Sequence, residues 1–367
     1  MHINTITCHD VYNHGASLQA YALQRYLIEQ GHDVEIIDYK PSYLSNHYRL
    51  SAISNPKYDM FLVRYLYFLA KLPGRLLALQ RKKSFDEFTS THLRLTSQRY
   101  DSNEALKQNC PIADTYIAGS DQIWNTIFPN GRDAAFYLDF VPQEKKRVSY
   151  AASFATEQIF EGYEGFVRDM VAKIDNISVR EEAGVKILKD LGIEGAVQVC
   201  DPVFLLNKDE WSELVQVVDN ENYLLVYDTE KSQIIKEIAT AVASRLNLKI
   251  FSISSFKLDY AEKNFNSAGP VEFISLIKKA KFVISNSFHG TAFSLIFEKN
   301  LCVVARSEAI NSRMQSLLDG AGLSERLVGP DYNVDNLLAK IDYSKVNENL
   351  VDIVDRSKKF LKEAIGF

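Results

Sequence analysis

The chain alternates short apolar runs with helical patterns, and it does so in two separate series. In the first, residues 1–8 and 34–39 have the pattern of strands, and residues 17–30 have that of a helix that stops at Gly31. A strand, a helix and a second strand within about 40 residues are typical of a parallel sheet. The second series runs over residues 223–305. We therefore predict an α/β protein with two doubly wound, Rossmann-like domains.

The polar stretch 207–222 separates the two series and marks the expected domain boundary. We predict an N-terminal Rossmann-like domain over residues 1–206, with a helical insertion at 42–96 that does not fit the alternation. A C-terminal Rossmann-like domain is expected over 207–342, followed by a helix in 343–367 that crosses back. Ligands of such sheets bind beyond the carboxyl ends of the strands, so polar residues at those ends are candidates for a site.

Charge and cysteine content narrow the class of protein. The chain carries 42 Lys and Arg against 47 Asp and Glu, a net charge of −5, whereas nucleic-acid binding usually needs a basic face. The four cysteines are about a hundred residues apart, which disfavours a structural zinc site and favours a reducing compartment. Neither a signal peptide nor a membrane-spanning apolar run is visible. We predict a cytoplasmic protein of bacterial type that binds no nucleic acid, metal or cofactor.

One stretch inside the insertion has a different charge balance. Between residues 57 and 83 the chain carries seven cations against the single acid Asp59, with apolar and aromatic residues interleaved. Such a basic amphipathic stretch can lie on an anionic membrane, which predicts peripheral contact with the inner face of a membrane. The alternative is a helix whose apolar face covers the first domain and whose cations reach past its edge.

The first candidate segment lies between the first strand and the first helix, at residues 13–19. Gly15 lets the backbone approach a ligand, and Asn13 or Ser17 can cap the helix, whose free N–H groups attract an anion. A capped turn without any ligand has the same pattern, and one glycine falls short of a phosphate-loop motif.

The second candidate segment is residues 116–125, an apolar strand that runs into a polar cluster. The cluster can bind a polyhydroxylated ligand or hold a catalytic acid, and Trp124 offers an apolar ring face to a sugar. The alternative is a turn in which Asp121 caps a following helix. The residues of this cluster that we take as candidates are Gly119, Ser120, Asp121 and Asn125.

The third candidate is Arg180, where a strand gives way to a helix. Its guanidinium fork suits a carboxylate or a phosphate. The alternative is a surface ion pair with Glu181 or Glu182, which would contribute little.

The fourth and strongest candidate segment is residues 282–292, an apolar strand that ends in small polar residues before a helix. Free N–H groups at that helix start can hold an anion, and His289 can exchange protons near neutral pH. A histidine that only caps the helix is the alternative. The candidate residues around His289 are Ser285, Asn286, Ser287, Gly290 and Thr291.

Taken together and in this order, six segments of the chain resemble the polysaccharide pyruvyl transferase family. The resemblance spans about residues 8–326, including a closing segment NSRMQSLLDGAGLSER at 311–326. It implies a glycosyltransferase-B-like architecture with a central cleft. The six segments are NHGASLQAYAL (13–23), AGSDQIWN (118–125), SYAASF (149–154), ISVREE (177–182), CDPVFLL (200–206) and VISNSFHGTAFSLIFEKN (283–300).

The resemblance also implies an activity, namely transfer of pyruvate from phosphoenolpyruvate to a pair of sugar hydroxyls as a ketal. The acceptor would be a sugar or a lipid-linked oligosaccharide in the biosynthesis of an exopolysaccharide, capsule or cell-wall glycan. His289 matches the family's acid/base histidine, with Asp121 as a second candidate, and Arg180 matches an arginine that contacts phosphoenolpyruvate. Members of the family often have an arginine where this chain has Ser287, so Arg313 or Arg306 would have to supply that charge.

Two other functions remain open at this point. His289 and Gly290 followed by Glu298 resemble the nucleotide-sugar segment of glycosyltransferases with this architecture, in which a carboxylate binds the ribose. The chain could also be a non-catalytic scaffold of a polysaccharide-assembly complex.

Overall fold

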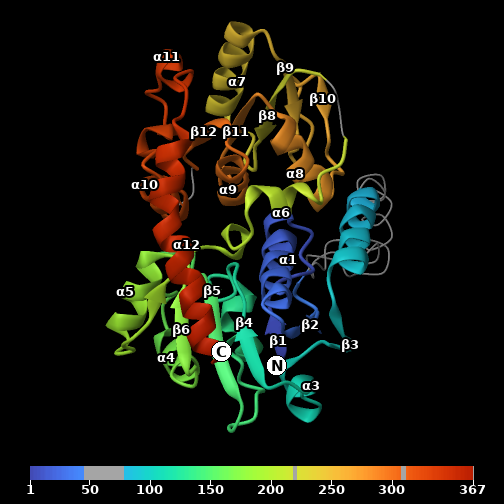
Figure 1. Ribbon diagram of the computed structural model, residues 1–367, viewed down its shortest axis with the longest axis vertical. Coiled ribbons are helices and arrows are strands. Elements are labelled where there is room, and N and C mark those ends of the chain that lie inside the picture. Colours follow the sequence, from blue (N-terminus) through green and yellow to red (C-terminus); the bar gives the residue numbers. More distant parts are fainter. Residues whose placement is uncertain (45–77, 218–220, 307–310, 367) are drawn as a thin grey trace, which may run out of the picture.

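Each half of the chain forms a parallel sheet with helices packed on it (Figure 1). The computed structural model describes residues 1–44, 78–217, 221–306 and 311–366. The two sheets lie in two lobes, one above the other, and both chain termini lie at the lobe that contains the first sheet (Figure 1). The predicted fold class is therefore confirmed.

The first sheet has the strand order β3-β2-β1-β4-β5-β6-β7, and its neighbouring strands run parallel. Its strands are β1 (His2–Ile6), β2 (Asp33–Tyr39), β3 (Leu95–Tyr100), β4 (Thr115–Ala118), β5 (Lys146–Ala152), β6 (Asn176–Val179) and β7 (Val197–Gln198). The helices of this half include α1 (His14–Glu29), α3 (Asn103–Gln108), α4 (Glu164–Val171) and α5 (Glu182–Asp190), with the short 3-10 helices η3 (Pro129–Arg132), η4 (Ala134–Tyr137) and η5 (Pro202–Phe204).

The second sheet has the order β10-β9-β8-β11-β12-β13, also parallel throughout. Its strands are β8 (Tyr223–Tyr227), β9 (Lys249–Ser252), β10 (Lys263–Asn264), β11 (Phe282–Ser285), β12 (Asn300–Val304) and β13 (Leu327–Val328). The helices of this half are α6 (Lys208–Ser212), α7 (Gln233–Leu246), α8 (Pro270–Lys279), α9 (Phe288–Ile296), α10 (Ser312–Ala321), η6 (Ser324–Arg326), α11 (Val334–Leu337) and α12 (Tyr343–Ile365).

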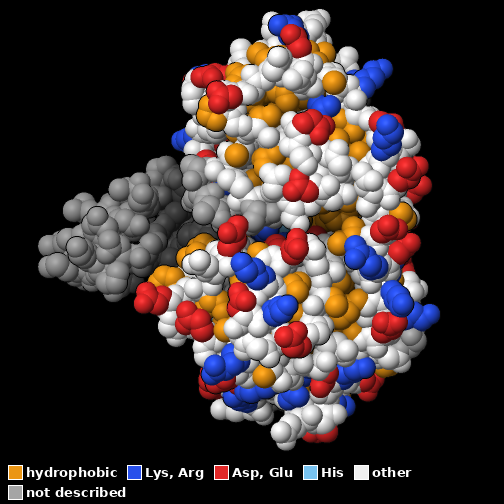
Figure 2. All heavy atoms as spheres, turned by 90° about the vertical axis from the view of Figure 1, so that its left-hand side faces the viewer, with side chains coloured by type: hydrophobic (Ala, Val, Ile, Leu, Met, Phe, Trp, Pro, Cys, Tyr) orange, Lys and Arg blue, Asp and Glu red, His pale blue; other side chains and the backbone are white. Residues whose placement is uncertain are grey.

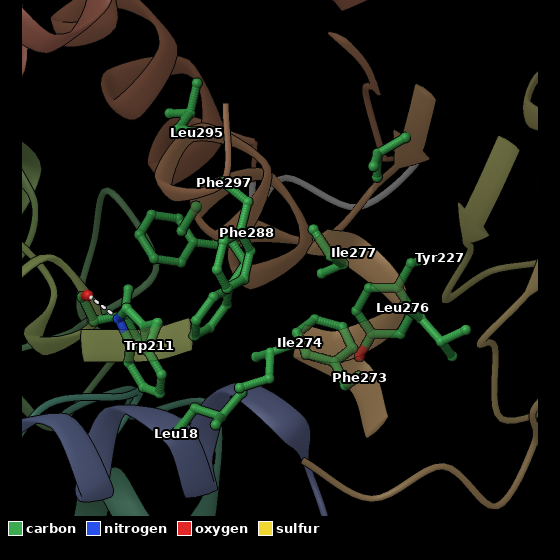
Figure 3. Packing of buried hydrophobic residues seen from close by; sticks show 14 of the residues in the cluster. Leu18, Trp211, Tyr227, Phe273, Ile274, Leu276, Ile277, Phe288, Leu295 and Phe297 are labelled. Atoms are coloured by element: carbon green, nitrogen blue, oxygen red, sulfur yellow. Dashed lines mark hydrogen bonds between the residues drawn. The ribbon is translucent and has the colours of Figure 1, made fainter. Parts of the chain in front are cut away.

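The lobes share a hydrophobic core at the waist. Leu18 from α1 and Trp211 from α6 belong to the same buried cluster as Phe273 from α8 and Leu295 from α9 (Figure 3). Trp211 also donates a hydrogen bond from Nε1 to the Val203 carbonyl at 2.9 Å, drawn as a dashed line in Figure 3. Because these buried side chains come from both halves, separating the lobes would expose apolar surface to water.

The last helix, α12, joins the two lobes a second time (Figure 1). Val346 near its start packs in the core at the waist, whereas Leu361 and Ile365 near its end pack against the first sheet. Between them, Ser357 accepts a hydrogen bond from the backbone N–H of Cys200 at 2.8 Å. This helix therefore packs back across the junction, as the sequence predicted.

The helical insertion is described only in part. Residues 78–92 form a helix in which Phe85 and Phe88 are buried, so this part covers the first lobe. Residues 45–77, which include most of the basic stretch 57–83, lie outside the described residues, and peripheral membrane contact through that stretch stays a prediction. Within the described ranges, no helix is both long and apolar enough to cross a bilayer.

Candidate functional site

The carboxylate of Asp201 is the centre of a buried cluster of polar side chains. It follows β7 and caps η5, where its Oδ1 accepts the backbone N–H of Val203 at 3.1 Å. Its Oδ2 accepts a hydrogen bond from Nη1 of Arg180 at 2.6 Å and one from Oγ of Ser120 at 3.4 Å, and lies 3.5 Å from Nε2 of His289. The cluster therefore joins three strand ends of the first sheet to the second lobe.

Arg180 directly follows β6, and its backbone N–H donates to the Ala152 carbonyl at 3.2 Å, which fixes its position. Its side chain is 2% exposed, and its Nε lies 3.5 Å from the carboxylate of Glu181, which also accepts the Ser153 hydroxyl. Nη2 of Arg180 has no hydrogen-bond partner among the described residues. A buried guanidinium with a donor left over is suited to bind an anion.

His289 lies in the first turn of α9 and is packed directly against the first lobe. A Cβ on Gly15 would stand only 1.9 Å from Nδ1 of His289, so the imidazole occupies space that any other residue at position 15 would fill. Gly15 belongs to the first turn of α1. The absence of a side chain at Gly15 thus lets His289 cross the waist and reach Asp201.

A pocket opens beside this cluster, between α10, α12 and the ends of β6 and β7. Arg313 of α10 lines it, with its guanidinium carbon 5.9 Å from the centre of the Phe288 ring, and Arg180 lies 4.7 Å from the same ring. Nε of Arg313 also has no hydrogen-bond partner within the described part of the chain. Two buried arginines therefore face one pocket beside His289. Figure 2 shows the waist between the lobes on the side of α10 and α12.

The charges in the cluster shift two pKa values. Burial by itself would raise the pKa of the Asp201 carboxyl, but the charges of His289 and Arg180 outweigh it and hold the pKa below its ordinary value. Burial, followed by repulsion from Arg180, lowers the pKa of the Arg313 guanidinium to about 10. Arg313 is therefore still charged at neutral pH but lacks a full complement of counter-charge, which an anionic ligand would supply.

Asp121 lies at the same end of the first sheet. It has a φ of 73°, forms a bridge with Ala152, and its charge acts on both Arg180 and Arg313. The interpretation of Asp121 as a helix cap was wrong, because a turn and no helix follows it. The sugar platform predicted at Trp124 was also wrong: Trp124 is fully buried, stacks on Tyr137 and donates to the Phe136 carbonyl.

The other predicted residues of the first lobe shape the turns around the cluster. Asn13, and not Ser17, caps α1, because its Oδ1 accepts the N–H groups of Gly15 and Ala16, and Ser17 is buried inside the helix. Gly119 allows a close approach to Thr7. Asn125 bonds within its own turn, to Gln122 and Ile127.

Around His289, the small polar residues hold the strand end in place. Ser285 donates to the Tyr227 carbonyl and accepts the N–H of Ser287, and Gly290 leaves room for the Ser285 hydroxyl. Asn286 bonds to Asp228 and Thr229. Thr291 donates to the Ser287 carbonyl. These residues position His289 and are not themselves gathered at the pocket with Arg180 and Arg313.

The sequence analysis missed Asp201 and Phe288 as site residues. Both stood inside segments already quoted, CDPVFLL and SNSFHGT, but neither carries a local pattern that separates a site residue from a turn residue. Asp201 is identified only by its contacts with Arg180 and His289. Across the described ranges, no group of three His, Cys, Asp or Glu side chains is arranged to hold a metal ion.

Next to the cluster, His14 forms a second buried contact between the lobes. Its Nε2 lies 2.9 Å from the Ala268 carbonyl and its Nδ1 lies 3.3 Å from the Tyr227 hydroxyl, while its ring stacks on Phe273. Burial, followed by repulsion from Arg81, holds the pKa of His14 well below its ordinary value of 6.5, so the imidazole stays neutral when folded.

This depressed pKa predicts a loss of stability in acid. Unfolded His14 takes up a proton as the pH falls below 6.5, but folded His14 does not, so acid favours the unfolded chain. We expect this residue to cost about 1.4 kcal/mol of unfolding free energy between pH values of about 7.5 and 5.5. Urea unfolding of the wild type and His14→Gln at both pH values measures the difference. Equal pH dependence in the two proteins would contradict the assignment.

Comparison with known proteins agrees with this fold and identifies the family. The sequence model of the polysaccharide pyruvyl transferase family matches residues 13–308, which is most of the chain. The chain therefore belongs to the polysaccharide pyruvyl transferase family, a family of transferases. Arg313 lies just beyond the matched residues. No curated protein matches the chain at a significant level.

Solved structures show the same architecture at low sequence identity. A UDP-N-acetylglucosamine 2-epimerase from Rickettsia bellii is 12% identical, with 100% of this chain and 97% of that chain covered and a TM-score of 0.51. A second UDP-N-acetylglucosamine 2-epimerase is 11% identical, with 99% and 94% covered and a TM-score of 0.56. These similarities show the glycosyltransferase-B-like fold alone.

Proposed function

We propose that the protein transfers pyruvate from phosphoenolpyruvate to two hydroxyls of a sugar, which leaves the sugar with a cyclic ketal. The observation that carries this proposal is the pair of buried arginines, Arg180 and Arg313, at one pocket beside His289. Phosphoenolpyruvate is small and has a carboxylate and a phosphate, so it offers one anionic group to each guanidinium. Charge-assisted contacts of this kind are among the strongest polar interactions in proteins.

In this proposal Arg313 takes the place of the arginine that the family often has at the position of Ser287. Arg306 was the other candidate, but its Nε donates to Glu230 at 2.6 Å, in an ion pair of its own. Arg313, by contrast, shares the Phe288 ring with Arg180. In this proposal the second cation at the donor site is therefore Arg313 of α10, and not a residue at position 287 after β11.

The chemistry requires a proton donor, a proton acceptor and a stabilised leaving group. A proton adds to the methylene carbon of phosphoenolpyruvate, the central carbon becomes electrophilic, and the first sugar hydroxyl attacks it and loses its own proton. The bond from carbon to phosphate oxygen then breaks, and the second hydroxyl closes the ketal as its proton leaves with the phosphate. We assign the proton transfers to His289, with Asp121 as the second candidate.

Asp201 acts in this scheme through His289 and Arg180. Its carboxylate lies 3.5 Å from Nε2 of His289 and 2.6 Å from Nη1 of Arg180. It therefore holds the imidazole and the guanidinium in a fixed relation. Held in this position, His289 can give a proton to the substrate and then take up a proton again.

The nucleotide-sugar alternative receives less support from the positions of the residues. Glu298, which would bind the ribose, lies past the last residue of α9, while His289 lies in the first turn. Nine helical residues span about 13 Å. The Glu298 carboxylate is already bonded to Lys208 and to Asn347. We therefore favour phosphoenolpyruvate, with a sugar or lipid-linked oligosaccharide of a cell-surface glycan as acceptor in the cytoplasm.

Binding of phosphoenolpyruvate to single-arginine variants tests the donor assignment. We expect Arg313→Gln to weaken binding by about 1.5–3 kcal/mol, or roughly tenfold or more, because one charge-assisted contact is lost. Arg306→Gln is the matched control and should change the dissociation constant less than about twofold, because its guanidinium is paired with Glu230. Isothermal titration calorimetry measures both. Equal losses in the two variants, or no binding by the wild type, would contradict the proposal.

A further inference from the structure

A second surface at the waist carries exposed apolar and polar side chains side by side. We call it the Phe160 rim and define it as Ile127, Thr156, Glu157, Gln158, Phe160 and Glu161, which line one open pocket. Ile127 is 49% exposed and Phe160 is 48% exposed, so both present apolar surface to water in this pocket. The rim is separate from the pocket that Arg180 and Arg313 line.

The ring of Phe160 is held in place by contacts with Arg132 and Thr126. Arg132 lies 4.7 Å from the centre of the Phe160 ring and 4.4 Å from that of Tyr163, and its Nε donates to the Thr126 carbonyl at 2.6 Å. The backbone N–H of Phe160 donates to the Thr126 hydroxyl at 2.8 Å. A fixed guanidinium against the ring and a bonded backbone orient Phe160, although half of its surface faces water.

The rim residues lie close in the sequence to residues of the candidate active site on both lobes. On the first lobe, its two segments directly follow the turn that contains Asp121 and the strand end that contains Ser153. On the second lobe, the pocket is lined by Asn311, two residues before Arg313. This closeness in the sequence is the reason to look for a second acceptor unit at the rim.

We propose that the Phe160 rim binds a neutral hexopyranose unit of the acceptor, next to the unit that is modified. A pyranose has an apolar C–H face that can cover an aromatic ring, and hydroxyls at its edge that suit the carboxylates and amide of Glu157, Gln158 and Glu161. The carboxylates also set the charge of the ligand, because they would repel a uronic acid or an anionic membrane surface. This inference rests on the proposed function in one respect: it takes the acceptor to be a glycan.

Saturation-transfer NMR with neutral tetrasaccharides of glucose, galactose, mannose and N-acetylglucosamine tests the proposal without any donor. We expect the wild type to bind at least one of them, and Phe160→Ala to weaken that binding about tenfold, the equivalent of one lost anchor contact. Phe160→Trp should retain it. The matched control is Phe128→Ala, which removes a neighbouring ring that is 50% exposed but does not line the pocket, and which should change binding less than about twofold.

Three results would overturn the sugar subsite. The proposal fails if no neutral tetrasaccharide binds the wild type, if the two alanine variants lose binding equally, or if anionic vesicles bind through Phe160 and the sugars do not. Calorimetry with phosphoenolpyruvate on Phe160→Ala should give the wild-type affinity. If the wild type binds the tetrasaccharide but not phosphoenolpyruvate, the sugar subsite is retained and the donor assignment is wrong. If it binds phosphoenolpyruvate but no tetrasaccharide, the donor assignment is retained and the sugar subsite is wrong.

Discussion

His289→Ala is expected to lower the rate of pyruvyl transfer by about 10²–10⁴-fold, the usual cost of losing a positioned acid/base. The imidazole is the group that both contacts the first lobe at Gly15 and pairs with Asp201. Because Asp201 keeps its contact with Arg180, the variant should still fold, and its melting temperature should stay close to that of the wild type. Release of phosphate from phosphoenolpyruvate in the presence of acceptor measures the rate.

His289→Gln is the companion variant, since it keeps a polar side chain against Gly15 but cannot exchange a proton near neutral pH. We expect it to be as slow as His289→Ala. Wild-type turnover by either variant in folded form would falsify the catalytic assignment. Arg180→Ala is a poorer test, because it would leave the buried carboxylates of Asp201 and Glu181 without their cation and destabilise the fold.

Gly15→Ala should lower transfer by about 10²-fold through His289, since displacements of about 1 Å at a reacting group have effects of that size. A methyl group at position 15 would stand 1.9 Å from Nδ1, and the imidazole would have to move. The matched control is Gly165→Ala in α4, where the nearest atom to a new Cβ is a flexible arginine tip at 3.8 Å. That variant should keep full activity.

A double variant separates this effect from a general loss of packing. In the His289→Ala background the imidazole is gone, so Gly15→Ala should cause little further loss of rate. Full additivity of the two substitutions would mean that Gly15 acts by another route. The same comparison by thermal denaturation should show that His289→Ala relieves the crowding that Gly15→Ala causes in the wild type.

The sequence predicted most of the parallel sheets because buried strands are continuous apolar runs. The apolar strands expected at the starts of residues 116–125 and 282–292 are present as β4 and β11. The sequence did not predict β3. Three consecutive residues of this edge strand are exposed, so its sequence shows neither an apolar run nor an alternation of apolar and polar residues. The start of α1 was placed three residues late, because Asn13 caps the helix in place of Ser17.

The site was predictable to the extent that strand ends meet at one edge of a parallel sheet. This rule brought Arg180 and Asp121 together, the pattern of residues 282–292 added His289, and the family resemblance added Arg313. The rule does not say which of two cations lies at the site. Arg306 and Arg313 could be distinguished only by their contacts, since Arg306 bonds to Glu230 and Arg313 lies at the Phe288 ring. The contact of Gly15 with His289 depends on how the two lobes pack, which no local pattern encodes.

The most direct test follows a label from donor to acceptor. Phosphoenolpyruvate labelled at its methylene carbon is incubated with the protein and a glycan extract from the cell envelope of the producing organism. We predict that the label appears in the methyl group of a glycan-bound ketal, that phosphate is released in equal amount, and that His289→Ala shows neither. Incorporation of a sugar from a labelled nucleotide sugar, with the phosphoenolpyruvate label left unreacted, would contradict the account.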